Sequence, residues 1–121
     1  MRKTLLILAS GIAIAAIASV SPLAWKMTTL DLGEVKANEV TDINFEFTNT
    51  ANNEVSILEA KGSCGCTQVE YPKEALAPGE TAQIAAKFKS SKPGVFSKTI
   101  SIKTNVAENY TVLTFKGTVV E

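Results

Sequence analysis

The stretch TDINFEFTN, residues 41–49, alternates between polar and large apolar side chains. Ile43, Phe45 and Phe47 fall on one face of an extended chain, and acidic or amide side chains occupy the positions between them. A period of two over this length is typical of a β-strand that has one face in a hydrophobic core and the other in water. The stretch therefore predicts a half-buried strand, and its three apolar side chains fix which face of that strand is buried.

The same period recurs along the chain on both sides of this strand, with turn residues between the segments. We expect about seven strands, at residues 29–35, 41–49, 55–60, 67–71, 81–89, 95–104 and 110–120. Short strands separated by Gly, Pro, Asn and Ser at this spacing predict an all-β sandwich. The predicted core is made of apolar residues that share the inner phase of their strands: Ile43, Phe45, Phe47, Ile84, Phe88, Ile100, Ile102, Leu113 and Phe115.

The first 25 residues differ from the rest of the chain. Two basic residues precede LLILASGIAIAAIASV, residues 5–20, which carry no charge. The tripeptide AIA at residues 16–18 fits the small-x-small pattern of a signal peptidase site, so the pattern predicts a signal peptide at residues 1–18. The alternative is an uncleaved hydrophobic anchor helix at residues 5–25, a run of 21 residues that is long enough to span a bilayer.

Both interpretations of the leader place the remainder of the chain outside the cytoplasm, because the positively charged end stays inside. We expect a short tether at residues 19–28, followed by one domain at residues 29–121. The protein would then be periplasmic, or anchored in the inner membrane with its domain in the periplasm. Contact with the membrane would be made only through the N-terminal segment, and only if that segment is not cleaved.

The composition of the 121 residues suits a single globular domain, with 45% hydrophobic and 20% charged residues. Twelve basic residues balance twelve acidic ones, and removal of the leader leaves ten against twelve. Nucleic-acid binding depends on clustered Lys and Arg. The charge balance therefore argues against DNA or RNA as a partner.

The two cysteines of the chain, Cys64 and Cys66, lie in the stretch KGSCGCTQVE at residues 61–70. A structural zinc site takes four Cys or His ligands, and the sequence has no histidine. Two thiolates alone can bind Cu(I), which prefers soft ligands. A catalytic cysteine needs a neighbouring base, usually His. The residues therefore predict no zinc site, no conventional enzyme and no cofactor, and Cu(I) binding is the least favoured use of the pair.

A disulfide or two packed thiols are the remaining alternatives for this pair. On a regular strand the Cα atoms of residues i and i+2 lie about 6.6 Å apart, whereas a disulfide needs Cβ atoms about 3.8 Å apart. We expect Gly65 to relieve this mismatch by kinking the backbone through φ values closed to other residues. A disulfide that closes so short a loop would stabilise the fold weakly and would exchange readily. The sequence leaves open a structural corner, oxidised or reduced, and an exchangeable thiol pair.

Four segments carry a family resemblance: SCGCT at 63–67, YPKEALAPGE at 71–80, GVFSKTISIKTN at 94–105 and LTFKGTVV at 113–120. Together they resemble the bacterial domain of unknown function 1573 family over residues 29–120. The resemblance implies an immunoglobulin-like sandwich, related to ASH and Hydin-type domains, in an exported protein. It implies no particular activity, since the family has none established. On the family's pattern, the signature and its supporting turn are Cys64, Gly65, Cys66, Thr67, Pro78, Gly79 and Glu80.

These observations predict an exported, non-enzymatic binding or structural module of the bacterial cell envelope. Exposed edge strands and end loops of a β-sandwich can contact another envelope protein or a glycan. The alternative is an accessory protein for thiol–disulfide exchange that uses Cys64 and Cys66 as its candidate redox residues. The two functions differ in whether the thiols or only the surface around them take part.

Overall fold

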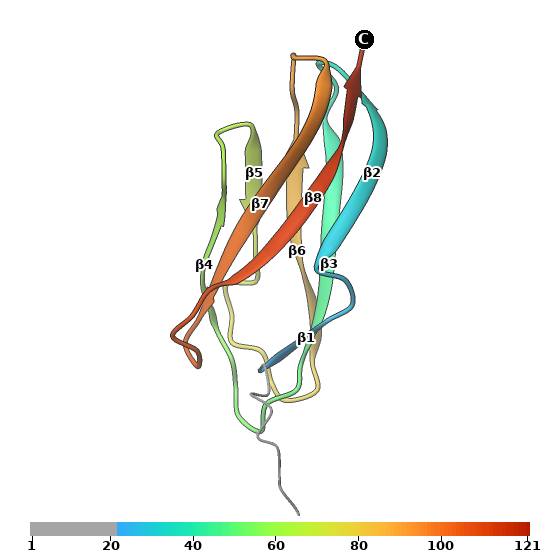
Figure 1. Cartoon of the computed structure of the whole chain (residues 1–121). Coiled ribbons are helices and arrows are strands. Elements are labelled where there is room, and N and C mark those ends of the chain that lie inside the picture. Colours follow the sequence, from blue (N-terminus) through green and yellow to red (C-terminus); the bar gives the residue numbers. More distant parts are fainter. Residues whose placement is uncertain (1–21) are drawn as a thin grey trace, which may run out of the picture.

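The computed structural model describes residues 22–121, which form two β-sheets packed face to face (Figure 1). The eight strands are β1 (Leu23–Trp25), β2 (Thr29–Lys36), β3 (Thr41–Asn49), β4 (Ile57–Gly62), β5 (Thr67–Glu70), β6 (Thr81–Phe88), β7 (Gly94–Thr104) and β8 (Thr111–Val120). The first sheet has the order β1-β3-β6-β5, and the second has the order β2-β8-β7-β4. The predicted all-β sandwich is confirmed. The predicted leader lies outside the described residues up to residue 21, and the last part of the alternative anchor at 5–25 is not helix, because Leu23–Trp25 form β1.

All strand pairs are antiparallel except one, in which β2 runs parallel to β8. The β2–β8 register shifts between Asp31 and Glu34, around Gly33, whose φ of 69° lies in the left-handed region. A Cβ on Gly117 of β8 would come within 2.6 Å of the Gly33 carbonyl oxygen, so glycine is required where these strands approach. Among residues 22–121 there is no helix of the length and apolarity needed to cross a membrane.

The structure has eight strands where we expected about seven, because part of the expected tether at 19–28 belongs to the domain. Residues 23–25 form β1, in which Leu23 pairs with Asn49 of β3 and is 3% exposed. The ring of Trp25 packs on Phe47, with ring centroids 4.7 Å apart. A strand of three residues is too short to give an alternation that stands out in the sequence. The predicted tether is therefore longer than the observed one.

The strand expected at 55–60 begins later than predicted, at Ile57, and continues to Gly62. Val55 lies before it and makes an isolated antiparallel bridge with Leu76. Both of these side chains are buried, so the bridge closes the core beneath the β3–β4 and β5–β6 connections. The apolar character of Val55 reflects this burial and not membership of a strand.

The core prediction is confirmed at all nine positions, each of which is at most 2% exposed: Ile43, Phe45, Phe47, Ile84, Phe88, Ile100, Ile102, Leu113 and Phe115. Strand pairing sets these side chains in register, since Phe45 lies opposite Ile84 and Ile100 lies opposite Leu113. Alternate residues of each strand point to the same face. The inner faces of the two sheets therefore form one continuous apolar layer.

The two ends of the sandwich carry different connections (Figure 1). The β2–β3, β4–β5 and β6–β7 turns lie at one end together with the C-terminus, tied by bonds from the Ala37 amide to the Val120 carbonyl (2.8 Å) and from the Asn38 amide to the Ser90 carbonyl (2.8 Å). Residue 22 and the β3–β4, β5–β6 and β7–β8 connections lie at the other end. We call the first of these the distal end, because it lies away from the start of the described chain.

Candidate functional site

Cys64 and Cys66 lie in the β4–β5 connection at the distal end, and a disulfide joins them. We call residues 63–66 the cysteine turn. β4 is an edge strand of the second sheet and β5 is an edge strand of the first sheet, so the turn connects the two sheets. The Cα atoms of the two cysteines are 5.3 Å apart. The chain has left extended geometry here, and the distance lies within the usual range for a disulfide.

Main-chain hydrogen bonds hold the cysteine turn independently of the disulfide. The Thr67 amide donates to the Cys64 carbonyl (3.3 Å), and the Lys89 amide donates to the Cys66 carbonyl (3.2 Å). Ser63 and Thr99 exchange two further bonds, from the Ser63 amide to the Thr99 carbonyl (2.9 Å) and from the Thr99 amide to the Ser63 hydroxyl (3.1 Å). The turn is therefore fixed to β7 and to the end of β6 whether or not the sulfurs are bonded.

Our expectation for Gly65 was wrong. Gly65 is not among the glycines with positive φ, and a Cβ built on it would meet no atom within 4 Å. The mismatch between strand geometry and the disulfide disappears because the cysteines lie in a turn and not on a strand. Gly62, which we had not singled out, is the glycine of this segment that is closely packed. A Cβ there would lie 3.1 Å from the Cβ of Thr67.

Thr67, the first residue of β5, places its hydroxyl beside both sulfurs. Its Oγ1 atom lies 3.8 Å from the Sγ of Cys64 and 3.9 Å from the Sγ of Cys66. The residue is buried, with 9% of its surface exposed. A buried hydroxyl needs a hydrogen-bond partner, and here sulfur atoms of either cysteine can serve. The signature residue Thr67 thus has a contact role that its position in the sequence did not reveal.

A groove of about 460 Å³ runs beside the cysteine turn, between the free edges of β4 and β5. Ala60, Gly62 and Val69 line it, and Cys64 borders it. We call it the edge groove. The Ser63 amide bonds to β7, and the main-chain groups of successive residues in an antiparallel strand point alternately toward and away from the paired strand. The amide and carbonyl of Ala60 and Gly62 therefore point away from β7, toward this free edge. Among residues 22–121, no strand pairs with the outer edge of β4.

Cys66 faces a different environment from Cys64. Both cysteines are half-buried, but Cys66 packs against the hydrophobic core, whereas Cys64 does not belong to that contact set. Cys66 borders a second depression, of about 300 Å³, that also contacts Val40, Lys87 and Lys89. The two cysteines of one disulfide therefore border two separate depressions of the domain.

The predicted turn residues Pro78, Gly79 and Glu80 lie far from the cysteines, in the β5–β6 connection at the other end of the sandwich. The Glu80 amide donates to the Ala77 carbonyl (3.0 Å), and Gly79 has a φ of 85°, as the third position of a type II turn requires. The Glu80 carboxylate accepts a bond from the Ala77 amide (2.9 Å). These residues shape the fold and do not join the candidate site.

A buried amide that we had not singled out, Asn49, fastens this turn to the domain. The side-chain nitrogen of Asn49 donates to the carbonyls of Leu76 (2.8 Å) and Asn53 (3.0 Å), and its side-chain oxygen accepts from the Ala51 amide (2.9 Å). The main chain of Asn49 also bonds to Gly79 and Glu80. In the sequence Asn49 looks like an ordinary turn residue at a strand end, so only its burial marks its role.

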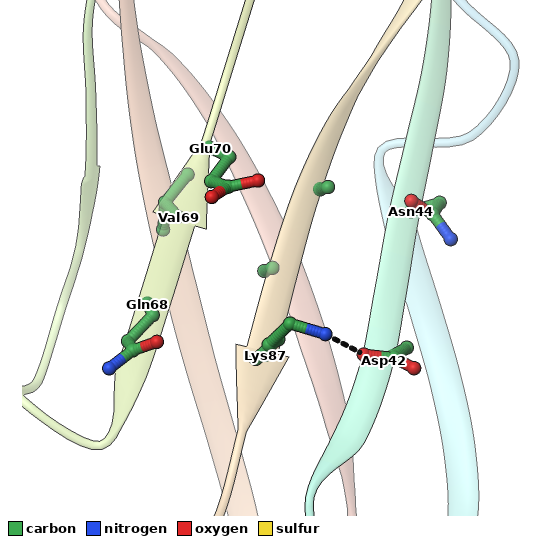
Figure 2. Close-up of a pocket in the computed structure, with 8 residues that line it drawn as sticks. Asp42, Asn44, Gln68, Val69, Glu70 and Lys87 are labelled. Carbon is green, nitrogen blue, oxygen red and sulfur yellow. Dashed lines mark hydrogen bonds and ion pairs between the residues drawn. The ribbon is translucent and has the colours of Figure 1, made fainter.

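Another depression, of about 470 Å³, lies on the outer face of the first sheet (Figure 2). Its floor is formed by Ala85 of β6, and the surrounding side chains are polar. Lys87 and Asp42 form an ion pair across it at 2.8 Å, with 60% and 70% of their side chains exposed. The hydrogen bond to Asp42 raises the pKa of Lys87 above its ordinary value of 10.5. This is a solvated strand face, and it brings no nucleophile together with a base.

The described residues contain no cluster of three or more His, Cys, Asp or Glu side chains that could hold a metal ion. The acidic side chains Glu46 and Glu70 lie exposed on the outer face of the first sheet, as their strand phase predicts. The site offered by the structure is therefore the cysteine turn together with the edge groove.

The strand orders define an immunoglobulin-like β-sandwich of the constant type, in which β1-β3-β6-β5 correspond to strands A-B-E-D and β4-β7-β8 to strands C-F-G, with β2 added alongside β8. The chain belongs to the family described as protein of unknown function DUF1573, whose model matches residues 23–119. The match begins at β1, which agrees with the corrected domain boundary. A comparison with curated proteins found no match.

Solved structures share this fold at low sequence identity. The ASH/PapD-like domain 7 of human CEP192 has a TM-score of 0.68 at 10% identity, over 93% of this chain and 97% of that one. A protein of unknown function from Porphyromonas gingivalis has a TM-score of 0.66 at 13% identity, over 83% of this chain and 50% of that one. The YadV chaperone has a TM-score of 0.51 at 12% identity, over 82% of this chain and 51% of that one. At these identities the likeness concerns the fold alone.

Proposed function

We propose that this protein is an exported, non-enzymatic binding module of the cell envelope, and that it holds an extended segment of another envelope protein in the edge groove. The observation that carries the proposal is the pair of free strand edges at this groove. An extended peptide can add to such an edge through main-chain hydrogen bonds, while side-chain pockets provide specificity.

The β4 edge is suited to this role because the residues whose main-chain amide and carbonyl groups face the free edge are small. Ala60 and Gly62 leave the strand backbone accessible, and both line the groove. The opposite edge, formed by β2, is interrupted by the bulge at Gly33 and carries charged side chains, which discourage strand addition. The two edges of the second sheet therefore differ in their capacity to accept a partner.

The place where the described part of the chain begins supports the same surface. Residue 22 and the cysteine turn lie at opposite ends of the sandwich (Figure 1). If the leader remains in the membrane, the cysteine turn and the distal part of the edge groove point away from the bilayer. If signal peptidase removes the leader, the groove is accessible in the same way. The YadV chaperone, which has a similar fold, is compatible with a partner-binding role for this fold but does not identify the partner.

Photo-crosslinking tests this proposal directly. A photoreactive amino acid at Lys61, which is exposed on β4 beside the groove, should trap a discrete envelope protein in living cells. The matched control is the same amino acid at Glu34, which is exposed on the β2 edge. Both variants should also carry Cys64→Ser and Cys66→Ser, so that capture reports binding and not disulfide chemistry. Equal crosslinking from both positions, crosslinking to no protein, or recovery of a glycan instead would contradict the proposal.

A proline on the free edge provides a second test. Ala60→Pro removes an amide that faces the groove and leaves the bonds of β4 to β7 in place, so the domain should fold while the crosslink from Lys61 weakens. The comparison variant Ala24→Pro removes an amide of β1 that faces β3, far from the groove, and should not alter that crosslink while the domain stays folded. An undiminished crosslink in folded Ala60→Pro protein would show that the partner does not add to the β4 edge.

Export is tested separately by N-terminal sequencing of the protein recovered from cell fractions. We expect a chain that begins at Ser19 in the periplasmic fraction. Recovery of the intact leader in the membrane fraction would replace cleavage by anchoring. Recovery of the intact leader in the cytoplasm would overturn export itself.

A further inference from the structure

We infer that the cysteine turn is an asymmetric thiol–disulfide exchange site, in which a cysteine thiolate of the bound partner attacks Cys64 and Cys66 leaves. The inference rests on the proposed function and deepens it, because Cys64 borders the edge groove that would hold the partner. The chemical class of the substrate is a peptide thiol. Three features of the structure carry the assignment.

The first feature is that the fold does not depend on the disulfide. Four main-chain and hydroxyl hydrogen bonds already fix the cysteine turn, to Thr67, Lys89 and Thr99. The bond closes a loop with one intervening residue, so it removes little conformational freedom from the unfolded chain. The sulfurs can therefore part and rejoin while the turn keeps its place.

The second feature is the difference in surroundings of the two cysteines. Cys64 borders the edge groove, where a partner segment would lie against the backbone of Gly62 and Val69. Cys66 packs against the core and opens to the other depression, beside Lys89. In disulfide exchange the attacking, attacked and leaving sulfur atoms lie nearly on a straight line. A thiolate that arrives along the groove therefore attacks Cys64 and expels Cys66.

The third feature is the surroundings of the leaving sulfur. A thiolate formed at Cys66 can accept a hydrogen bond from the Thr67 hydroxyl, whose oxygen is 3.9 Å away in the disulfide form. Lys89 also lines this depression, as does Lys87, whose ammonium is paired with Asp42. Hydrogen-bond donors and positive charges stabilise a thiolate, and a more stable thiolate leaves faster. Thr67 is thus a positioning residue for the exchange.

The step balances without an external oxidant. The partner thiol first loses its proton to solvent, and its sulfur then forms a bond to the Sγ of Cys64 while the Cys64–Cys66 bond breaks and its electron pair remains on Cys66. The Cys66 thiolate can reverse the step by attacking Cys64 and releasing the partner. If the partner has a second thiol, the thiolate of that second group can instead attack the partner sulfur that is bonded to Cys64. This attack forms a disulfide within the partner and releases the Cys64 thiolate. Two electrons have then passed from the partner dithiol to Cys64 and Cys66.

Reaction of the purified protein with reduced glutathione, used as the thiol probe, tests which sulfur is attacked. Acid quenching followed by peptide mass spectrometry should locate the glutathione adduct on Cys64, in about tenfold excess over Cys66. Adducts distributed equally, adducts mainly on Cys66, or no adduct on the folded wild type would overturn the inference.

Thr67→Val tests the positioning role, because valine keeps the methyl contact with Gly62 and removes the hydroxyl. In the Cys64→Ser background, the pH profile of Cys66 alkylation should shift to higher pH in Thr67→Val and return in Thr67→Ser. A merely structural role for Thr67 would leave this profile unmoved. The Lys61 crosslink is measured without either cysteine, so it can succeed when exchange fails and fail when exchange succeeds.

Discussion

The side-chain amide of Asn49, at the end of β3, donates a 2.8 Å hydrogen bond to the carbonyl of Leu76, 27 residues away in the β5–β6 connection. Asn49 is fully buried, and Leu76 is 2% exposed. The bond joins two connections of the sandwich inside its apolar interior, where an unpaired amide would be costly. One polar side chain thereby sets the path of the chain into the turn at Pro78 and Gly79.

Asn49→Ala should lower the free energy of unfolding by about 1–3 kcal/mol, because it leaves the half-buried Ala51 amide without its acceptor and removes a buried bond to the Leu76 carbonyl. Urea denaturation followed by tryptophan fluorescence provides the measurement. The control is Asn52→Ala, at an exposed position in the same connection, which should change stability by no more than about 0.5 kcal/mol. Equal effects of the two substitutions would mean that the Asn49 bonds do not stabilise the fold.

Phe45→Ala should lower the free energy of unfolding by about 3–5 kcal/mol, because it empties part of the central layer between the sheets. Phe45 is 1% exposed and lies opposite Ile84. Val95→Ala, at a position that is 85% exposed, is the matched truncation and should be nearly neutral. A loss below about 1 kcal/mol for Phe45→Ala would contradict the buried phase of β3.

Gly65→Ala and Gly79→Ala should differ in sign. Gly79 has a φ of 85°, so alanine there should cost about 1–2 kcal/mol of backbone strain. Gly65 has no positive φ and open space at its Cβ position, so alanine should be neutral or should stabilise the protein by up to about 1 kcal/mol. Thermal denaturation of both variants checks the pair, and a strongly destabilised Gly65→Ala protein would restore the kink that we first expected.

Replacement of both cysteines by serine should leave a folded protein that loses at most about 2 kcal/mol of stability, the upper bound for so short a closed loop. Circular dichroism and urea denaturation measure the outcome. Wild-type protein treated with a reductant provides the comparison, since it keeps the thiols in place. If the variant unfolds while the reduced wild type remains folded, the serines and not the missing bond are responsible. Unfolding of both would make the disulfide structural.

Tyr110 should titrate above its ordinary pKa of 10.0, because its hydroxyl donates a 3.0 Å hydrogen bond to the Glu59 carboxylate and that negative charge opposes ionisation. The folded state thus holds the phenolic proton more tightly than the unfolded state. The resulting stabilisation is present below the unfolded pKa and is lost as pH rises through the folded value. Absorbance titration in a Tyr71→Phe background isolates Tyr110, and Glu59→Gln should lower its pKa. An unchanged titration curve in Glu59→Gln would refute the cause given.

The sequence by itself determined the fold class and the composition of the core. The alternation from Ile43 to Phe47 predicts which side chains face inward without knowledge of the paired strand. Successive side chains of a strand point to opposite faces, whichever strand lies beside it. The turn at Pro78 and Gly79 could be predicted for the same reason, since its backbone preference belongs to those two residues.

Only the tertiary structure decided what lies next to what. Pairing with β3 made residues 23–25 a strand, and the crossing between two sheet edges made the CGC segment a turn beside a groove. The contacts of Asn49 with Leu76, and of Thr67 with Gly62 and both sulfurs, likewise depend on how separate segments pack. Periodicity reports the environment of each side chain but not the identity of its neighbours, and those neighbours arise from long-range strand pairing that no local stretch encodes.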